Sequence, residues 1–148
     1  CAPHANSYHR FQSGSYAPVN MSWGYNNRTV SIRIPANNGP DMRIEHRLAG
    51  ADANPYLLVS ALLAGLHYGL ITKTEPPAPV EGNAYLQTDT ELPLTWEQAR
   101  NHFDHAKILP EYFGKEFCLL FSNLKLGEQI RFMSTIAPLE YDWYLKTV

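Results

Sequence analysis

The chain has 148 residues, 45% hydrophobic and 18% charged, which suffices for one domain with a hydrophobic core but not for two large domains. Its formal net charge of −2 argues against a broad surface for nucleic acid or for a membrane. The only cysteines, Cys1 and Cys118, are too few for a disulfide scaffold and favour a reducing compartment, the cytoplasm.

Two antiparallel strands are predicted in the first third of the chain. Residues 29–34 (TVSIRI) and 42–48 (MRIEHRL) both alternate with period two, and the turn-forming PANNGPD lies between them. Successive side chains of a strand point to opposite sides, so the second strand carries its charges on one face. The charged residues that we expect on that face are Arg43, Glu45 and Arg47, with Arg33 on a comparable face of the neighbouring strand.

A buried helix is predicted after the strands. Asn54 is a suitable N-cap and Pro55 a suitable first helical residue. The sixteen residues that follow are apolar nearly all round, which is typical of a buried helix and not of an amphipathic one. Ser60, His67 and two glycines interrupt this stretch, so we expect no membrane span. Residues 1–72 therefore hold the strands and one buried helix.

The rest of the chain is predicted to be a loop followed by helices. Residues 73–94 are proline-rich and lack a period, which indicates a loop outside the core. Thr95 and Gln98 form a capping box for a short helix, and the helical end of the chain covers residues 95–148. We expect Gly127 and Pro138 to divide its last helical stretch.

The arginines are distributed unevenly. Five of the seven lie within the first 47 residues, whereas all five lysines come from Lys73 onward. Arginine is favoured where planar oxyanions must be held in a fixed orientation, so the strand face is predicted to bind carboxylates or phosphates. The alternative is a solvated strand surface with compensating charges. Glu45, placed among arginines, suits either a structural ion pair or a hard divalent cation.

Several motifs resemble, in order and spacing, the carboxy-terminal part of the catalytic domain of the glutamine synthetase family. They are NSYHRF, GSYAPV, NNRTVSIRIP, RIEHR and GADANPYLLVSALLAGLHYG. The resemblance is specific over residues 3–71 and looser up to EYDWYL. It implies an α+β fold: the carboxy-terminal half of a barrel of antiparallel strands packed with helices. The chain starts without methionine, so we expect it to be part of a longer protein, inactive alone and with an incomplete barrel.

Family enzymes use ATP to convert the γ-carboxylate of glutamate into a γ-glutamyl phosphate, which an amine then attacks. They do so between subunits of a ring-shaped, dodecamer-like oligomer, with Mg²⁺ or Mn²⁺ ions. The resemblance implies a role for each charged residue of the motifs. These are Arg10 and Arg47 for the glutamate substrate, Arg28, Arg33 and Arg43 for the ATP phosphates, and Glu45 for a metal ion. Arg28 is also expected to stabilise the transferring phosphoryl group.

Tyr16 departs from the family pattern. Ammonia-using members have a glutamate at this place in GSYAPV, where it helps to deprotonate ammonium. Tyrosine is neutral at pH 7, so it cannot supply that negative charge. We therefore expect Tyr16 at the catalytic centre of an enzyme that uses an organic amine. The segment SWGYNNRTVSIRIP resembles that of the γ-glutamylputrescine synthetases of polyamine breakdown.

Two alternatives stay open beside this reading. One is glutamine synthetase proper, with ammonia as the nucleophile. The other is a non-catalytic structural relative, which would be expected to lose the anion-binding residues. The chain keeps all six of the charged residues to which the resemblance gives a role.

Overall fold

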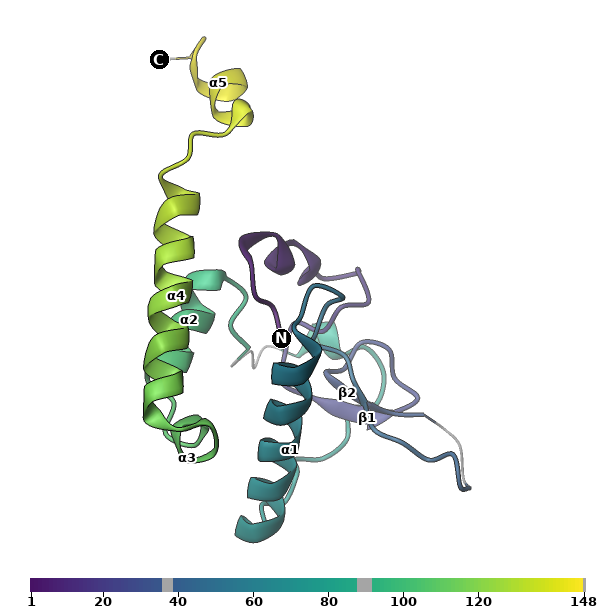
Figure 1. The fold of residues 1–148 in the computed structure, drawn as a ribbon. Coiled ribbons are helices and arrows are strands. Elements are labelled where there is room, and N and C mark those ends of the chain that lie inside the picture. Colours follow the sequence, from purple (N-terminus) through teal and green to yellow (C-terminus); the bar gives the residue numbers. More distant parts are fainter. Residues whose placement is uncertain (36–38, 88–91, 148) are drawn as a thin grey trace. The chain divides into compact units, whose positions relative to one another are not determined.

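The computed structural model describes residues 1–35, 39–87 and 92–147, and the chain divides into two compact units, Cys1–His102 and Phe103–Val148 (Figure 1). The first unit contains the 3₁₀ helix η1 (Ala5–Arg10), the strands β1 (Trp23–Tyr25), β2 (Ile32–Ile34) and β3 (Glu45–His46), the helix α1 (Pro55–Thr72), the 3₁₀ helix η2 (Ala84–Leu86) and most of α2 (Trp96–Asp104). The second contains α3 (Leu109–Phe113), α4 (Lys115–Met133) and α5 (Pro138–Tyr144).

The three strands form one sheet in the order β1-β2-β3. Strands β2 and β3 pair in antiparallel fashion, as predicted, although both are shorter than the period-two pattern indicates. Their register places Arg33 directly opposite Glu45. Strand β1, which was not predicted, pairs with β2 in parallel. The connection between the expected strands includes residues 36–38, which lie outside the described part of the chain.

The proline-rich segment is bound to the sheet, contrary to the expectation of a loop outside the core. We call residues 77–85 the strap. The strap follows β1, because Val80 N donates to Trp23 O at 2.8 Å and Trp23 Nε1 donates to Pro77 O at 2.6 Å. The approach is so close that a Cβ on Gly24 would lie 2.7 Å from Val80 O. Ala84, at the end of the strap, is fully buried. Residues 88–91 of the predicted loop are not described.

The core beneath the strap is small and partly polar. Val30 is completely buried, and Asn20 is 1% exposed. The Asn20 side chain donates from Nδ2 to Ala84 O at 2.6 Å and accepts from Ser22 Oγ at 2.6 Å. These bonds satisfy the buried amide, which would otherwise destabilise the fold. Side-chain hydrogen bonds therefore help to hold the strap against the rest of the first unit.

Helix α1 begins as predicted but is not buried. Asn54 Oδ1 accepts hydrogen bonds from Tyr56 N and Leu57 N at 3.0 and 3.1 Å, which confirms the N-cap. Within the described chain, Ala64 is the one residue of the helix that is buried, while Leu63 and Leu66 are 61% and 54% exposed. A helix that is apolar on every side needs neighbours on every side, and the described elements cover only one side of it. The residues on that side that are half-buried or buried are Leu57, Leu58, Ala61, Leu62, Ala64, Tyr68 and Gly69.

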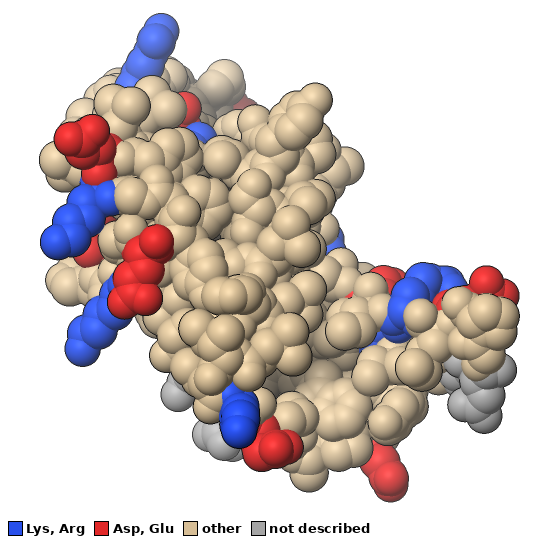
Figure 2. Space-filling view, turned by 60° about the horizontal axis from the view of Figure 1, so that its bottom comes forward, with Lys and Arg blue, Asp and Glu red and all other residues tan. Residues whose placement is uncertain are grey.

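Exposed uncharged surface is not confined to α1. Most of the face shown in Figure 2 carries neither Lys, Arg, Asp nor Glu. By length and composition α1 could also cross a membrane, but the core helices of soluble proteins pass the same test. The exposure of α1 therefore identifies apolar surface without identifying what covers it.

The two other predicted helix boundaries that rest on capping or proline are also confirmed. Thr95 Oγ1 accepts from Gln98 N at 3.2 Å at the start of α2, and Pro138 opens α5. The prediction for Gly127 is wrong, because this residue lies inside α4. The break instead falls at Gly114, whose φ of 83° lies in the left-handed region that glycine adopts without strain.

Candidate active site

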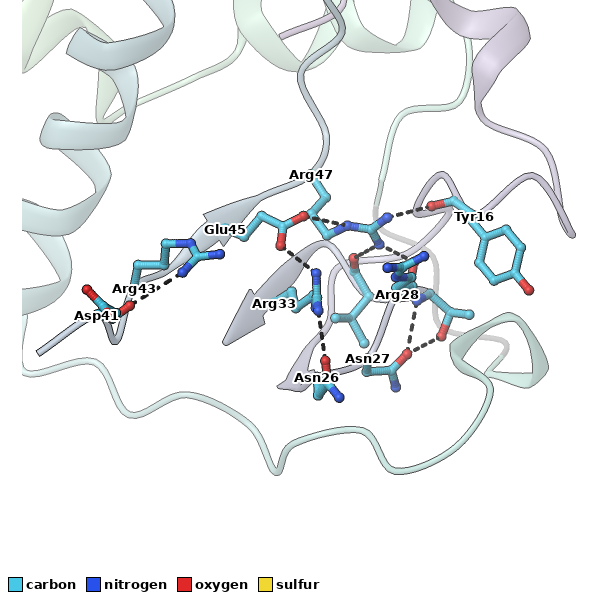
Figure 3. A network of polar contacts seen from close by, with 11 residues as sticks. Tyr16, Asn26, Asn27, Arg28, Arg33, Asp41, Arg43, Glu45 and Arg47 are labelled. Atoms are coloured by element: carbon cyan, nitrogen blue, oxygen red, sulfur yellow. Dashed lines mark hydrogen bonds and ion pairs between the residues drawn. The ribbon is translucent and has the colours of Figure 1, made fainter. Parts of the chain in front are cut away.

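Glu45 lies between two arginine side chains on the sheet (Figure 3). Its Oε2 is 2.9 Å from Arg33 NH1, across the β2–β3 pair, and its Oε1 is 3.4 Å from Arg47 Nε. Arg33 NH2 also donates to Asn26 Oδ1 at 2.7 Å. The strand register causes this arrangement, because directly opposed residues of an antiparallel pair bring their side chains together. The predicted row of charges is therefore confirmed for these three residues.

The guanidinium of Arg47 is bound to the backbone on two further sides. Its side chain is 15% exposed. NH2 donates to Tyr16 O at 2.9 Å, and NH1 donates to Val30 O at 3.2 Å and to the carbonyl of Arg28. Tyr16 and Arg28, both labelled in Figure 3, come from different segments of the chain. Arg47 thus joins the turn at Tyr16 to the loop that carries Arg28.

Arg10 lies next to this network. Its NH1 donates to Leu48 O at 2.8 Å and its NH2 to Arg47 O at 2.5 Å. The structure therefore brings together the two arginines that were predicted to hold the glutamate substrate. In both of them, donors of the guanidinium are bonded to main-chain carbonyls of the chain itself.

Arg28 and Arg33 line an open cavity of about 710 Å³ between the loop after β1 and the strap. Tyr25, Asn27 and Glu81 contribute to its wall. Arg28 is exposed, and its guanidinium donates to no acceptor among the described residues. The cavity therefore presents one arginine fixed by Glu45 and one that is available to an anion.

Asn27 holds the two walls of the cavity together. Its Nδ2 donates to Gly82 O at 2.8 Å and to Val80 O at 3.2 Å, both in the strap. Its Oδ1 accepts from the Thr29 hydroxyl at 2.7 Å, and that hydroxyl accepts from Ala84 N at 2.9 Å. Sequence reasoning missed the roles of Asn26 and Asn27, although both stand in the NNRTVSIR motif directly before the arginine.

Arg43, the third arginine predicted at the ATP phosphates, does not line this cavity. It is exposed, and its NH1 lies 3.4 Å from Asp41 O, which is at the outer limit of a hydrogen bond. The structure thus groups Arg28 and Arg33 and leaves Arg43 apart from them.

Tyr16 lies in an unusual backbone conformation. Its φ is 58°, in the left-handed region that non-glycine residues seldom adopt. Tyr16 is 63% exposed. Figure 3 shows the ring pointing away from Arg47, whereas the carbonyl points toward it. The turn is closed by Ser15, whose hydroxyl donates to Gln12 O at 2.6 Å and accepts from Ala17 N at 3.2 Å.

Glu45 does not form a complete metal site with the described residues. Divalent cations such as Mg²⁺ take about six oxygen ligands. Among residues 1–35, 39–87 and 92–147, no group of three His, Cys, Asp or Glu side chains could hold a metal ion. Both carboxylate oxygens of Glu45 are already paired with arginines. The donor set of the described chain does not by itself fit the cation.

Two further titratable groups lie close to the network. Burial of the ring lowers the pKa of His46, whose Nδ1 is buried without a partner in the described part of the chain. The hydroxyl of Ser7 donates to Asp52 Oδ2 and lowers the pKa of that carboxyl, with His4 Nδ1 3.7 Å from the same oxygen. This cluster ties η1 to the residues that precede α1. Sequence reasoning gave no signal for it, because its members lie 45 residues apart.

Comparison with known proteins assigns the chain to a family. A family model described as the catalytic domain of glutamine synthetase matches residues 1–144. The chain is 41% identical to the γ-glutamylputrescine synthetase PuuA of Escherichia coli (strain K12), over 98% of the chain and 31% of that protein. It is 33% identical to a glutamine synthetase of Thermus thermophilus, over 98% of the chain and 34% of that protein.

A solved structure, a complex of GmaS with ADP, superimposes with a TM-score of 0.83 at 28% identity. The superposition covers 97% of this chain and 35% of that one. The chain thus spans about a third of the length of the relatives that it matches. The chain belongs to the glutamine synthetase family and corresponds to part of its α+β catalytic domain.

Proposed function

We propose that this chain is part of an ATP-dependent ligase that joins the γ-carboxylate of glutamate to an organic amine through a γ-glutamyl phosphate. The observation that supports this function best is the cavity lined by Arg28 and Arg33. Phosphoryl transfer depends mainly on positioned positive charge, and the two guanidiniums supply such charge on one wall. Membership of the glutamine synthetase family supports ATP-dependent glutamate ligation in general.

The residues of the cavity divide this work between them. ATP, when bound, supplies the phosphoryl group that activates the glutamate carboxylate. Arg33 is held by Glu45 and Asn26, so it presents a fixed charge to a phosphate. Arg28 has no such tie among the described residues and can move onto the transferring group. The family-derived roles of Arg10 and Arg47 at glutamate, of Arg43 at ATP and of Glu45 at Mg²⁺ or Mn²⁺ stay predictions, as do the ring-shaped oligomer and the cytoplasmic location.

An organic amine is favoured over ammonia for two reasons. Tyr16 offers a neutral phenol where an ammonia-using site would need a carboxylate. In addition, relatives that match nearly the whole chain include a γ-glutamylputrescine synthetase at 41% identity and a γ-glutamylethanolamide synthetase of Streptomyces coelicolor at 37%. Glutamine synthetase activity is the second candidate, because the Thermus thermophilus relative carries that name. A non-catalytic role is disfavoured by the presence of every charged residue of the network.

The test is a substrate panel with the full-length protein that contains these residues. ADP release is measured with ATP, glutamate and, in turn, putrescine, ethanolamine, isopropylamine or ammonia. We expect at least one organic amine to exceed ammonia in kcat/KM by about tenfold or more, which corresponds to about 1.4 kcal/mol in transition-state stabilisation. Turnover with ammonia alone would contradict the choice of acceptor, and no ADP release with any acceptor would contradict the ligase.

The isolated 148-residue chain serves as a second arm of that test. It covers about a third of the length of its relatives, and its described residues do not complete a metal site. We therefore expect no ADP release from the isolated chain under conditions in which the full-length protein turns over. Turnover by the isolated chain would show that these residues form a complete site.

A further inference from the structure

Asn27 uses every hydrogen-bonding group of its side-chain amide. Such an amide has two N–H donors and an oxygen that can accept two bonds. Nδ2 donates to Gly82 O at 2.8 Å and to Val80 O at 3.2 Å, both in the strap. Oδ1 accepts from Thr29 N at 2.9 Å and from the Thr29 hydroxyl at 2.7 Å. A polar network whose members are all satisfied is rigid, so the amide links the strap firmly to the loop after β1.

The bond from Thr29 N encloses Arg28. An asparagine oxygen that accepts from the backbone N–H two residues further on forms an Asx turn, which fixes the backbone of the residue between them. Here that residue is Arg28, one of the two arginines that line the cavity (Figure 3). The Thr29 hydroxyl accepts in turn from Ala84 N at 2.9 Å, so a second bond joins the same turn to the strap.

The side chain of Arg28 has no comparable support. Arg28 is exposed, and its guanidinium donates to no acceptor among the described residues. The position of the guanidinium therefore depends on the backbone from which the side chain extends. Arg33, in contrast, is held directly through its guanidinium by Glu45 and Asn26. A shift of the Asx turn would thus move Arg28 and leave Arg33 in place.

We propose that Asn27 is a positioning residue for phosphoryl transfer: its amide holds the backbone of Arg28 against the strap and so directs the Arg28 side chain into the cavity. This inference rests on the proposed function, in which Arg28 stabilises the transferring group. An aspartate could not replace Asn27, because a carboxylate has no N–H donor and would place an oxygen against the carbonyls of Val80 and Gly82. A nearly isosteric substitution therefore tests the role.

The first test is Asn27→Asp in the full-length protein, with Asn123→Asp on the exposed surface of α4 as the matched control. A displacement of about 1 Å at a catalytic group can cost about 10²-fold in rate, so we expect kcat for ADP release to fall about 10- to 100-fold. The KM values for glutamate and for the amine should change less than about threefold. The control should change none of these values. An unchanged kcat, or a loss confined to the KM values, would overturn the proposal.

A double-mutant cycle with Arg28→Ala shows whether Asn27 acts through Arg28. Without the Arg28 guanidinium, the loss of kcat caused by Asn27→Asp should shrink to less than about twofold. A direct effect of the new carboxylate on the phosphates would persist in that background. Equal effects of Asn27→Asp in the wild-type and Arg28→Ala backgrounds would therefore contradict the proposal.

Thr29 provides a test of the same turn that introduces no charge. Thr29→Val removes the hydroxyl that joins Asn27 Oδ1 to Ala84 N, whereas Thr29→Ser keeps a hydroxyl at this place. We expect Thr29→Val to lower kcat several-fold and Thr29→Ser to keep most of the wild-type value. Equal kcat values for the two variants would contradict the link between the Asx turn and the strap on which the proposal depends.

A crystal structure of the wild-type full-length protein with ADP keeps the proposal testable if the variants do not fold. We expect Asn27 Nδ2 to stay within hydrogen-bond distance of Val80 O and Gly82 O. A strap that lies away from Asn27 in that structure would overturn the proposal. Failure of the wild-type protein to release ADP with glutamate and any acceptor is a different result, because it rejects the proposed function itself.

Discussion

The strand region and the long helices satisfy their side chains in opposite ways. In the strand region, which comprises residues 10–35, 39–47 and the strap, many charged and polar groups find partners within the chain, as Glu45 does with Arg33 and Arg47. The helices α1 and α4 instead leave large apolar side chains in solvent, with Leu63 61% and Leu120 71% exposed. The difference shows that hydrogen bonds and ion pairs can close over a short stretch of chain, whereas apolar faces need opposing surfaces.

Energetics explain why the two regions differ. Full burial of a leucine side chain contributes about 1.5–3 kcal/mol, and that contribution is missing wherever the side chain stays exposed. The chain represents about a third of the length of its relatives. We therefore expect the strand region to keep its local arrangement in the full-length protein, and we expect the apolar faces of α1 and α4 to be covered there.

The largest effect is expected from Arg28→Ala in the full-length protein. An arginine that stabilises a transferring phosphoryl group contributes about 10³-fold or more to kcat. Arg28 lines the cavity, so we expect a loss of about that size in ADP release. Arg43→Ala, outside the cavity, should reduce kcat by about tenfold or less. A larger loss for Arg43→Ala than for Arg28→Ala would show that the cavity is not the phosphate site.

Leu66→Glu tests whether the apolar surface of α1 is covered in the full-length protein. Burial of an unpaired charge is strongly unfavourable, so this variant should lower the free energy of unfolding of the full-length protein by about 3 kcal/mol or more. In the isolated chain, where Leu66 is 54% exposed, the same change should instead reduce self-association. Urea unfolding and analytical ultracentrifugation provide the two measurements.

The control for Leu66→Glu is Thr74→Glu, which adds the same charge at an exposed position after the C-cap of α1. It should change neither property. If Leu66→Glu leaves the full-length protein as stable as the wild type, α1 is exposed in the whole protein, and the contrast between the regions is not a matter of missing surfaces.

Two glycines provide a smaller and more local test. Gly24→Ala places a Cβ 2.7 Å from Val80 O, so the strap must move, with an expected loss of about 1–3 kcal/mol. Gly127→Ala adds a methyl group inside α4, where the described chain has no atom within 4 Å apart from the helix's own backbone and the adjoining residues, and should stabilise the helix by about 1 kcal/mol. Urea unfolding of both full-length variants measures the difference.

The outcome for each glycine separates the two regions. An unchanged stability for Gly24→Ala would contradict the close packing of the strap on β1. If Gly127→Ala instead lowers the stability of the full-length protein, another part of the protein packs closely against α4 at that position.

The sequence carried the signals that are local. Period-two alternation predicted the β2–β3 pair and therefore the meeting of Arg33 with Glu45. The N-cap of α1 is a contact between the Asn54 side chain and the backbone N–H two residues further on, so the identity of Asn54 was enough to predict it. Arg28 and Arg33 line one cavity, whereas their binding of ATP phosphates stays a prediction.

Long-range contacts and backbone conformation were not predictable in the same way. Strand β1 is three residues long, too short to show a period, and the strap is fixed by bonds such as that from Asn20 to Ala84, 64 residues further on. The choice between Gly114 and Gly127 as a helix break depends on which of them takes a positive φ. The bonds from Arg47 to main-chain carbonyls were not predicted, because they depend on a turn geometry that composition does not reveal. Its role at glutamate stays a prediction.

The smallest effect concerns Ser7 and the pH dependence of stability. The Ser7 hydroxyl is the main cause that lowers the pKa of Asp52, so the carboxylate stabilises the folded state at pH values above its ordinary pKa of about 4. This contribution is lost as the pH falls through the lowered pKa of the folded state, where both states become protonated. Ser7→Ala should therefore be less stable than the wild type at pH 6, and the difference should shrink at pH 3 and below.

Urea unfolding of the full-length protein at the two pH values measures that difference, with Ser13→Ala on an exposed turn as the control. The control should show no pH-dependent difference from the wild type. A gap between Ser7→Ala and the wild type that is equal at pH 6 and pH 3 would mean that the bond stabilises η1 without any linkage to the Asp52 proton. In that case the Ser7–Asp52 cluster would stabilise the fold through its hydrogen bond and not through the charge of Asp52.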